Sequence, residues 1–255
     1  MTKEFWENQA EKFKTDVKAV NFDPMEEELE SFLLDKFIGD NEIICDLGCG
    51  NGRTILSMAL QKKNTVFYGL DFSKNMIEVA DAHKRDLQLQ NVHFLNIDAT
   101  LMNLSGIITQ KFDKVLTKRL LINLKGDAKF RALDNIYSLL KNGGSYLMIE
   151  CFIEPLQRIN EIRRQLDLEE IKVKFFNEYL SFDILEKMSE RFCVAEKIDF
   201  GSLYYFISRV FNAYLSEGEP DYNAPINRLA VELIKKGVNP IEGYSPEIMF
   251  LFKKK

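Results

Sequence analysis

The densest group of residues with chemical potential is an aspartate followed by alternating glycines, Asp46-Leu47-Gly48-Cys49-Gly50-Asn51-Gly52. The apolar run before it predicts a buried strand, and the pattern after it predicts a helix. A glycine-rich turn between a strand and a helix directs backbone N–H groups and a helix N-terminus at one spot beyond the sheet. We therefore expect a polar or anionic part of a ligand to bind there.

The spacing of the glycines favours one kind of ligand over others. Nicotinamide and flavin sites use G-x-G-x-x-G. The third glycine of that pattern would fall at position 53, which is Arg53, whereas the glycine here is Gly52. The carboxylate of Asp46 would repel a pyrophosphate but suits an ammonium group. A ligand that carries both an ammonium and a carboxylate fits this turn better than a dinucleotide does.

Two further aspartates follow predicted strands. Asp71 closes the second strand, where a carboxylate can accept both hydroxyls of a ribose. Asp98 closes the third strand, where a carboxylate can accept from an exocyclic amine such as that of adenine. The carboxyl ends of parallel strands meet at one edge of a sheet, so we expect the three carboxylates to lie along one site. Asp46 then matches an amino acid, Asp71 a ribose and Asp98 a base.

The turn, with Gly69-Leu70-Asp71-Phe72-Ser73 and Asn96-Ile97-Asp98-Ala99, resembles the successive motifs of class I S-adenosylmethionine-dependent methyltransferases over about residues 40 to 152. The resemblance implies S-adenosylmethionine as cofactor and S-adenosylhomocysteine as product. The turn would hold the methionine part, Asp71 the ribose and Asp98 the adenine. The cofactor-binding residues that it implies are Asp46, Gly48, Cys49, Gly50, Gly52, Asp71, Phe72, Met76, Ile97, Asp98, Ala99 and Thr117, the last near the methyl sulfonium.

The remaining elements predict an α/β fold. Apolar runs alternate with helical patterns, which is typical of a mostly parallel sheet covered on both faces. The resemblance implies a Rossmann-like seven-stranded methyltransferase sheet whose last strand is antiparallel, with helical additions over the carboxyl edge. The expected strands are Ile43 to Leu47, Thr65 to Asp71, Val92 to Ile97, Phe112 to Thr117, Ser145 to Phe152, Phe192 to Phe200 and Glu247 to Phe252. The expected helices are Arg53 to Gln61, Lys74 to Leu87 with Ser73 as N-cap, Lys129 to Leu140 with Asn142-Gly143-Gly144 as its stop, Leu156 to Leu168 and Phe182 to Met188.

Three segments lie outside this alternation. Residues 1 to 40 predict a helical N-terminal unit, and Trp6 and Phe13 at helical spacing predict that it folds over the cofactor as a lid, with a plain hydrophobic anchor as the alternative. The resemblance implies that residues 41 to 255 form a methyltransferase domain. Its insertions at about 153 to 181 and 201 to 245 follow the fifth and sixth strands to the carboxyl edge, where we expect them to build the acceptor pocket.

The insertions concentrate aromatic, amide and cationic groups suited to a polar ring, although a small aromatic core of the insert is an equal reading. Many small-molecule members of the class carry histidine near position 123, where this chain has Asn123, which is no general base. The candidate general bases are Glu150, Asp183, Tyr179, Tyr204 and Tyr205. The candidate acceptor-binding residues are Arg119, Asn123, Asn177, Tyr179, Tyr204, Tyr205 and Arg209, of which Arg119 or Arg209 would orient an anionic acceptor.

Composition limits the alternatives. A net charge of -5 and the absence of long basic runs disfavour nucleic acid as partner. A charged N-terminus and the lack of an apolar run of roughly 18 residues predict a cytoplasmic protein without a membrane span. The 4 cysteines and 2 histidines lack metal-site spacing, so we expect reduced buried thiols, structural histidines and no metal.

The favoured function is O-methylation of a sugar or another small polar metabolite. The segments Thr117 to Leu124 and Tyr222 to Arg228 resemble methyltransferases of bacterial surface-sugar and nucleotide-sugar pathways. N-methylation of an amine or amino sugar is an alternative, since a neutral amine needs no strong base. A regulatory protein that binds S-adenosylmethionine without catalysis is an alternative of another class. The sequence leaves the oligomeric state open.

Overall fold

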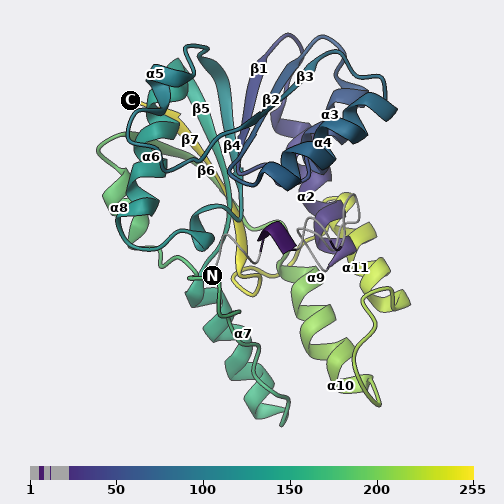
Figure 1. Cartoon of the computed structure of the whole chain (residues 1–255). Helices are drawn as coiled ribbons and strands as arrows, with labels where there is room; N and C mark the ends of the chain where they lie inside the picture. The colour runs from purple at the N-terminus through teal and green to yellow at the C-terminus, as the bar shows by residue number, and fades with distance from the viewer. Residues whose placement is uncertain (1–5, 9–11, 13–22) are drawn as a thin grey trace.

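The computed structural model describes residues 6–8, 12 and 23–255, and its centre is a seven-stranded sheet with the order β3-β2-β1-β4-β5-β7-β6 (Figure 1). Strands β1 to β5 pair in parallel, whereas β7 pairs antiparallel with both β5 and β6. The expected mostly parallel sheet with an antiparallel last strand is confirmed. The strands are β1 (Ile43–Leu47), β2 (Val66–Asp71), β3 (Val92–Asn96), β4 (Phe112–Lys118), β5 (Leu140–Cys151), β6 (Phe192–Ile198) and β7 (Glu247–Lys254).

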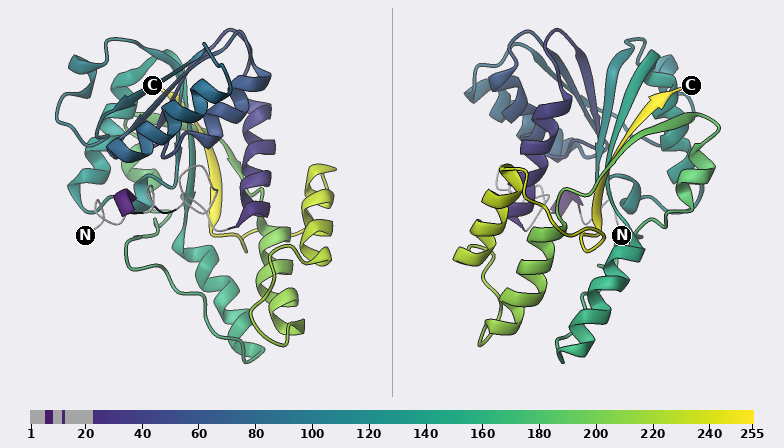
Figure 2. Two further views of the ribbon diagram at one scale, coloured as in Figure 1. Left: turned by 45° about the vertical axis from the view of Figure 1, so that its right-hand side comes forward. Right: turned by 180° about the vertical axis from the view of Figure 1, so that it is seen from behind.

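Helices cover both faces of the sheet, which Figure 1 and the view from behind in Figure 2 show from opposite sides. Within β1, Ile44 packs against the helices of one face, and its neighbours Cys45 and Leu47 pack into the core of the other face. This alternation follows from the two-residue period of a strand. The helices are α2 (Pro24–Phe37), α3 (Arg53–Gln61), α4 (Lys74–Asp86), α5 (Leu104–Ile107), η2 (Leu121–Asn123), α6 (Asp127–Leu139), α7 (Ile153–Gln165), α8 (Ile184–Met188), α9 (Ser202–Phe206), the π-helix η3 (Ile207–Asn212), α10 (Ala213–Leu215) and α11 (Pro225–Lys235).

Local signals set two helix ends. The Ser73 side chain accepts from the Met76 N–H, so its prediction as the N-cap of α4 is confirmed. The prediction that Asn142-Gly143-Gly144 stops the preceding helix is wrong, because α6 ends at Leu139 and the three residues lie within β5. The β4–β5 register shifts beside them, and Gly143 adopts a φ of 73°, so the glycines serve an irregularity in the strand.

The insertions form two arms that leave the carboxyl edge (Figure 1). One arm is α7 with the segment 166–180 that follows it, and the other runs from α9 through η3 and α10 to the segment before α11. The arms share a small core in which Leu156 and Ile159 meet Tyr205 and Val210. In the N-terminal unit, α2 packs against α11. Phe13 and most of the predicted lid lie outside the described residues.

The cysteines differ in their surroundings. Cys45, Cys49 and Cys151 are buried free thiols, as expected. Cys193 is also free, but it is exposed, because β6 is the edge strand of the sheet and pairs with β7 alone. None of the helices described at residues 6–8, 12 and 23–255 is long and apolar enough to cross a membrane.

We predict that Gly52→Ala destabilises the fold much more than Gly143→Ala. Both residues have a positive φ, 74° and 73°, which disfavours alanine by about 1 to 2 kcal/mol at either position. A Cβ at Gly52 would lie 2.5 Å from Cζ of Phe94, whereas one at Gly143 would meet no atom within 4 Å. Overpacking adds about 1 to 3 kcal/mol at Gly52 alone. Urea unfolding of both variants measures the difference, and equal losses would contradict this packing.

Candidate functional site

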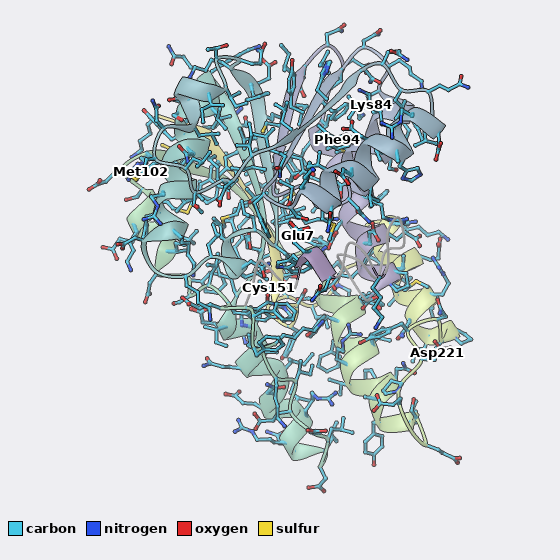
Figure 3. All side chains as sticks on the ribbon, viewed as in Figure 1. Glu7, Lys84, Phe94, Met102, Cys151 and Asp221 are labelled. Carbon is cyan, nitrogen blue, oxygen red and sulfur yellow. The ribbon has the colours of Figure 1, made fainter. Side chains whose placement is uncertain are left out.

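A cavity of about 650 Å³ lies at the carboxyl edge of the sheet. Its walls come from the ends of β1, β2, β4 and β5, from the start of α2 and from both arms. In Figure 3, Glu7 and Cys151 mark this middle region, between the sheet above and the arms below. The cavity has one part beside the glycine turn and another beside the arms.

The glycine turn forms the first wall. Gly48, Cys49 and Gly50 line the cavity. Gly48 and Gly50 have positive φ values of 84° and 54°, and a Cβ at Gly48 would lie 2.9 Å from a methyl carbon of Leu120. Gly52 was expected to bind the cofactor but does not line the cavity. It is needed instead on the opposite side of the turn, where its α-carbon packs against Phe94.

Asp46 ends β1 with its side chain in the cavity wall. The residue is 2% exposed, and its Oδ1 atom has no hydrogen-bond partner among the described residues. Burial raises the pKa of this carboxyl to about 7, with Lys118 lowering it and Asp71 raising it. A buried carboxylate oxygen without a partner is costly. The site therefore requires a hydrogen-bond donor here, and a cationic donor fits best.

Asp71 connects the turn to β2. Its Oδ2 accepts from the Gly50 N–H at 2.9 Å, and its Oδ1 accepts from the Ser73 N–H at 2.8 Å. Burial raises its pKa to about 6, while these two hydrogen bonds lower it. Each carboxylate oxygen has a lone pair left for a ligand hydroxyl. Phe72 and Met76 line the cavity beside it.

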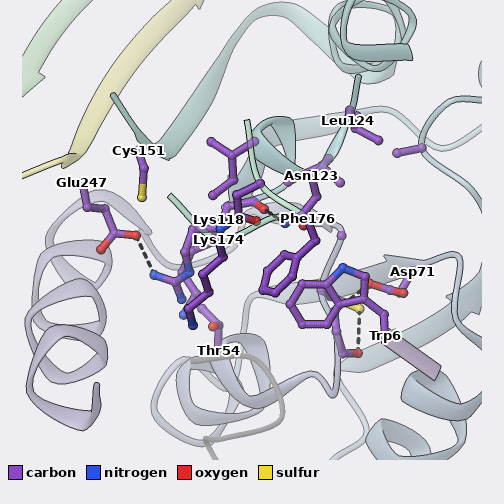
Figure 4. Close-up of a pocket in the computed structure, with 18 of the residues that line it drawn as sticks. Trp6, Thr54, Asp71, Lys118, Asn123, Leu124, Cys151, Lys174, Phe176 and Glu247 are labelled. Carbon is purple, nitrogen blue, oxygen red and sulfur yellow. Dashed lines mark hydrogen bonds and ion pairs between the residues drawn. The ribbon is translucent and has the colours of Figure 1, made fainter. Parts of the chain in front are cut away.

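Asp98, Ile97 and Ala99 line the cavity beyond β3. Oδ1 of Asp98 accepts from the N–H of Thr100 at 2.9 Å and from its hydroxyl at 2.7 Å. These two hydrogen bonds orient the carboxylate at the cavity wall. Trp6 also lines the cavity, and its ring meets that of Phe176 edge to face at 5.7 Å (Figure 4).

Thr117 and Glu150 do not line the cavity, contrary to expectation. Thr117 is fully buried and shares a hydrogen bond of 2.7 Å with the Tyr146 hydroxyl, because strand alternation turns its side chain into the core. Glu150 accepts from the N–H groups of Leu120, Leu121 and Ile122. Its carboxyl caps the short helix η2 and so positions the segment after β4. It is no general base for an acceptor in the cavity.

Two other candidates also lie elsewhere. Asp183 is exposed and begins α8, away from the cavity lining. Tyr204 is 1% exposed, and its hydroxyl donates to both carboxylate oxygens of Asp23 at 2.8 Å. The helical turn of α9 places Tyr205 in the cavity wall and its neighbour Tyr204 in the core. Tyr204 therefore supports Asp23 and does not touch the cavity.

Arg119 lies in a buried ion cluster. Its guanidinium pairs with Glu30 and Glu247, and Lys118 also pairs with Glu30 at 2.7 Å. The two carboxylates raise the pKa of Arg119 further, whereas Arg119 and Lys118 lower that of Glu30 to about 2. Figure 4 shows Glu247 and its partner beside Lys118 and Lys174. Arg119 lines the cavity with its charge already balanced, so its expected role in holding an anionic acceptor is weakened.

The arms supply the rest of the wall. Arg209 pairs with Asp23 at 2.7 Å, and its guanidinium lies 4.9 Å from the Tyr205 ring and 4.4 Å from the Tyr222 ring. Tyr179 and Cys151 line the cavity together. The amide residues Asn123 and Asn177 line it as well, and the Nδ2 of Asn123 donates to the Arg119 carbonyl at 2.7 Å.

Sequence reasoning missed several residues of the wall. Glu247 and Cys151 were detectable, because the first residue of an antiparallel last strand and the last residue of β5 both lie at the carboxyl edge. Asp23 and Glu26 carried only the signal of a helix start, with Asp23 as the N-cap of α2. Among the residues that the structure describes, no group of three or more His, Cys, Asp or Glu side chains could hold a metal ion.

Comparison with known proteins assigns the chain to a family. Residues 38–197, more than half of the chain, match the family model described as a methyltransferase domain. The chain belongs to this methyltransferase family. Carboxy-S-adenosyl-L-methionine synthase of Nautilia profundicola is 29% identical over 159 residues, 62% of this chain and 64% of the synthase. The tRNA (guanine-N(7)-)-methyltransferase of Bacillus subtilis is 33% identical over 87 residues, 34% of this chain and 38% of that protein.

The matched parts thus span less than two thirds of the length of these curated relatives. Among solved structures, the N-methyltransferase NodS of Bradyrhizobium japonicum, in complex with S-adenosyl-L-homocysteine, has a TM-score of 0.58. It is 13% identical, and the match covers 99% of this chain and 98% of NodS. This likeness shows a shared fold.

S-adenosylmethionine is the cofactor of this methyltransferase, and the cavity fits it. The unpartnered oxygen of buried Asp46 can accept from the ammonium group, and the two glycines with positive φ leave room for the backbone to approach the methionine part. Asp71 would receive the ribose hydroxyls and Asp98 the adenine amine. Thr117 and Gly52 take no direct part.

We predict that the affinity for S-adenosylhomocysteine rises as pH increases from 6 to 8. An ammonium ligand favours the ionised form of Asp46. Because the pKa of Asp46 is about 7, its carboxyl has to lose a proton when the ligand binds below this pH. The dissociation constant of the wild-type chain should fall about 20-fold over this interval, about tenfold from Asp46 and about twofold from Asp71, whose pKa is about 6. In Asp46→Asn only the twofold contribution of Asp71 should remain. Calorimetry at each pH measures this, and an unchanged slope in the variant would exclude Asp46 as the titrating group.

Proposed function

We propose that this chain transfers the methyl group of S-adenosylmethionine to a hydroxyl of a small polar acceptor, a sugar or sugar derivative being the leading class. When bound, the cofactor supplies an electrophilic methyl group. The residues of the chain then have to hold the acceptor nucleophile in line and accept its proton. The part of the cavity beside the arms is the proposed acceptor pocket, defined by Asn123, Asn177, Tyr179, Tyr205, Arg209 and Tyr222.

One observation carries the proposal for a hydroxyl-rich acceptor. The Oδ1 atoms of Asn123 and Asn177 are buried at the cavity and have no hydrogen-bond partner among the described residues. The amide of Asn123 is oriented by its Nδ2 bond to Arg119, so its oxygen is the atom left without a donor. A buried acceptor without a donor costs about 1 to 3 kcal/mol. Ligand hydroxyls would satisfy both oxygens, and the tyrosine rings would pack on a sugar face.

Amines form the second candidate class. The acceptor pocket is bordered by the carboxyl groups of Asp23, Glu26 and Glu247. Carboxyl groups attract an ammonium and can take its proton, which favours an amine or amino sugar as a substrate. By their names, the Bacillus subtilis relative and NodS are methyltransferases, whereas the Nautilia profundicola relative is a synthase. The acceptor is therefore inferred from this pocket and not from the relatives.

A panel assay tests the proposal. The purified chain is incubated with S-adenosylmethionine and separate pools of sugars, nucleotide sugars, amino sugars and RNA, and release of S-adenosylhomocysteine is measured. Turnover confined to hydroxyl acceptors, with a methylated product by mass spectrometry, is the expected result. Turnover confined to amino sugars would establish the second candidate. Turnover of RNA alone, or binding of S-adenosylhomocysteine without turnover of any pool, would contradict the proposal, the latter favouring a regulatory role.

We predict that Asn177→Ala raises KM for the acceptor about 3- to 10-fold, because one hydrogen bond to the bound acceptor contributes about 0.5 to 1.5 kcal/mol. The dissociation constant of S-adenosylhomocysteine should change less than twofold. Asn142→Ala, at an exposed position on β5, is the matched control and should change neither value. Steady-state kinetics and calorimetry provide both measurements. A loss of cofactor affinity equal to the rise in KM would place Asn177 in the cofactor part instead.

A further inference from the structure

A hydroxyl acceptor needs a group that takes its proton, and the candidates within the acceptor pocket are few. Glu150, Asp183 and Tyr204 lie outside the cavity lining. Tyr179 and Tyr205 lie within it, but their pKa values are raised above that of free tyrosine, that of Tyr179 first by the neighbouring Cys151 thiol and that of Tyr205 first by burial. Tyrosines of this kind remain protonated at neutral pH and are poor bases.

Asp23 is a cavity-lining carboxylate whose oxygens are already occupied. Its Oδ1 accepts from the N–H groups of Met25 and Glu26 at 3.1 and 3.2 Å. The Tyr204 hydroxyl donates to both oxygens, and Arg209 donates to Oδ2 at 2.7 Å. These donors occupy the carboxylate, so Asp23 has a structural role at the start of α2.

Glu247 is occupied in a different way. Its carboxyl pairs with Arg119 and also interacts with the carboxyl of Glu30. Burial and the negative charge of Glu30 raise the pKa of Glu247, while Arg119 lowers it. Its Oε1 is bonded to Arg119, so Glu247 holds this ion cluster together, although its Oε2 has no hydrogen-bond partner among the described residues.

Glu26 differs from these groups. It lies in the first turn of α2 and lines the cavity while half-buried. The structure shows no hydrogen bond or ion pair between its carboxyl and any described residue. Asp23 precedes it by one helical turn and Glu30 follows by one turn, so the three carboxyls share a face of the helix start. Arg119, which directly follows β4, and Arg209 of η3 oppose this negative charge.

We propose that Glu26 is the general base of the reaction, an assignment that rests on the proposed function. Its carboxylate takes the proton of the acceptor hydroxyl as the oxygen bonds to the methyl carbon. The bond between that carbon and sulfur breaks with its electron pair remaining on sulfur, which leaves S-adenosylhomocysteine and a protonated Glu26. With an amine acceptor, Glu26 would take the proton of the ammonium group before transfer.

The electrostatic surroundings match this role. Burial and the charge of Asp23 raise the pKa of Glu26 to about 7, against the opposing effects of Arg209 and Arg119. A base with this pKa is largely ionised just above neutral pH and still binds a proton firmly. Tyr204, Arg209 and Asp23 are positioning residues, since their hydrogen bonds hold the first turn of α2 against the cavity.

The first measurement requires no acceptor. The chain is labelled with [δ-¹³C]glutamate, and its carboxyl resonances are titrated by NMR in the complex with S-adenosylhomocysteine. The resonance that disappears in Glu26→Gln belongs to Glu26. A midpoint near 7 supports the proposal, and a midpoint near 4.5 overturns it. This result stands even if the panel yields no acceptor, an outcome that would contradict the proposed function separately.

The second measurement uses an acceptor that the panel identifies. Glu26→Gln should lower kcat by about 100-fold or more and remove the acidic limb of its pH profile, while the affinity for S-adenosylhomocysteine stays within twofold. Glu26→Ala should recover activity with added formate, which a merely structural role would not allow. Glu28→Gln, on the same helix but bonded to Arg228 and Lys235, is the matched control and should retain wild-type kcat. A Glu26→Gln enzyme with more than a third of wild-type kcat would overturn the proposal.

Discussion

The interaction on which the site depends is that between buried Asp46 and a cationic ligand group. Removing a carboxylate from water is costly unless a donor or a positive charge replaces the lost hydration. Within the described residues, Asp46 has one oxygen without such a donor, although Lys118 lowers its pKa from a distance. The ammonium of S-adenosylmethionine would supply the donor that this position lacks. We therefore expect cofactor binding and ionisation of Asp46 to be linked.

Two other buried carboxylates at this edge, Glu30 and Glu150, have their partners within the fold. Glu30 pairs with both Lys118 and Arg119, and Glu150 accepts from three backbone N–H groups of the segment that follows β4. Together they fix the helix α2 and this segment on either side of the cavity. By contrast, the side chains of Asn123, Asn177 and Glu26 line the cavity with oxygen atoms for which the structure shows no hydrogen-bond partner among the described residues.

The sheet and the cofactor part of the cavity followed from the sequence, because strand ends and glycine turns are local signals. Asp46, Asp71 and Asp98 line one cavity since each ends a parallel strand or follows it directly. The predictions that Thr117 and Glu150 line the cavity were wrong. A position at the end of a strand does not determine which face of the sheet the side chain takes. Glu26 escaped prediction because only the packing of α2 brings it to the carboxyl edge, more than a hundred residues from the arms in sequence.

The most direct test of the account removes the ammonium group from the ligand. Calorimetry would compare S-adenosylhomocysteine with its analogue lacking the α-amino group, against both the wild-type chain and Asp46→Asn. A charge-assisted hydrogen bond contributes about 1.5 to 3 kcal/mol. Loss of the amino group should therefore weaken binding to the wild-type chain at least about tenfold more than it weakens binding to the variant. Equal losses in the two proteins would contradict the pairing of Asp46 with the ammonium group.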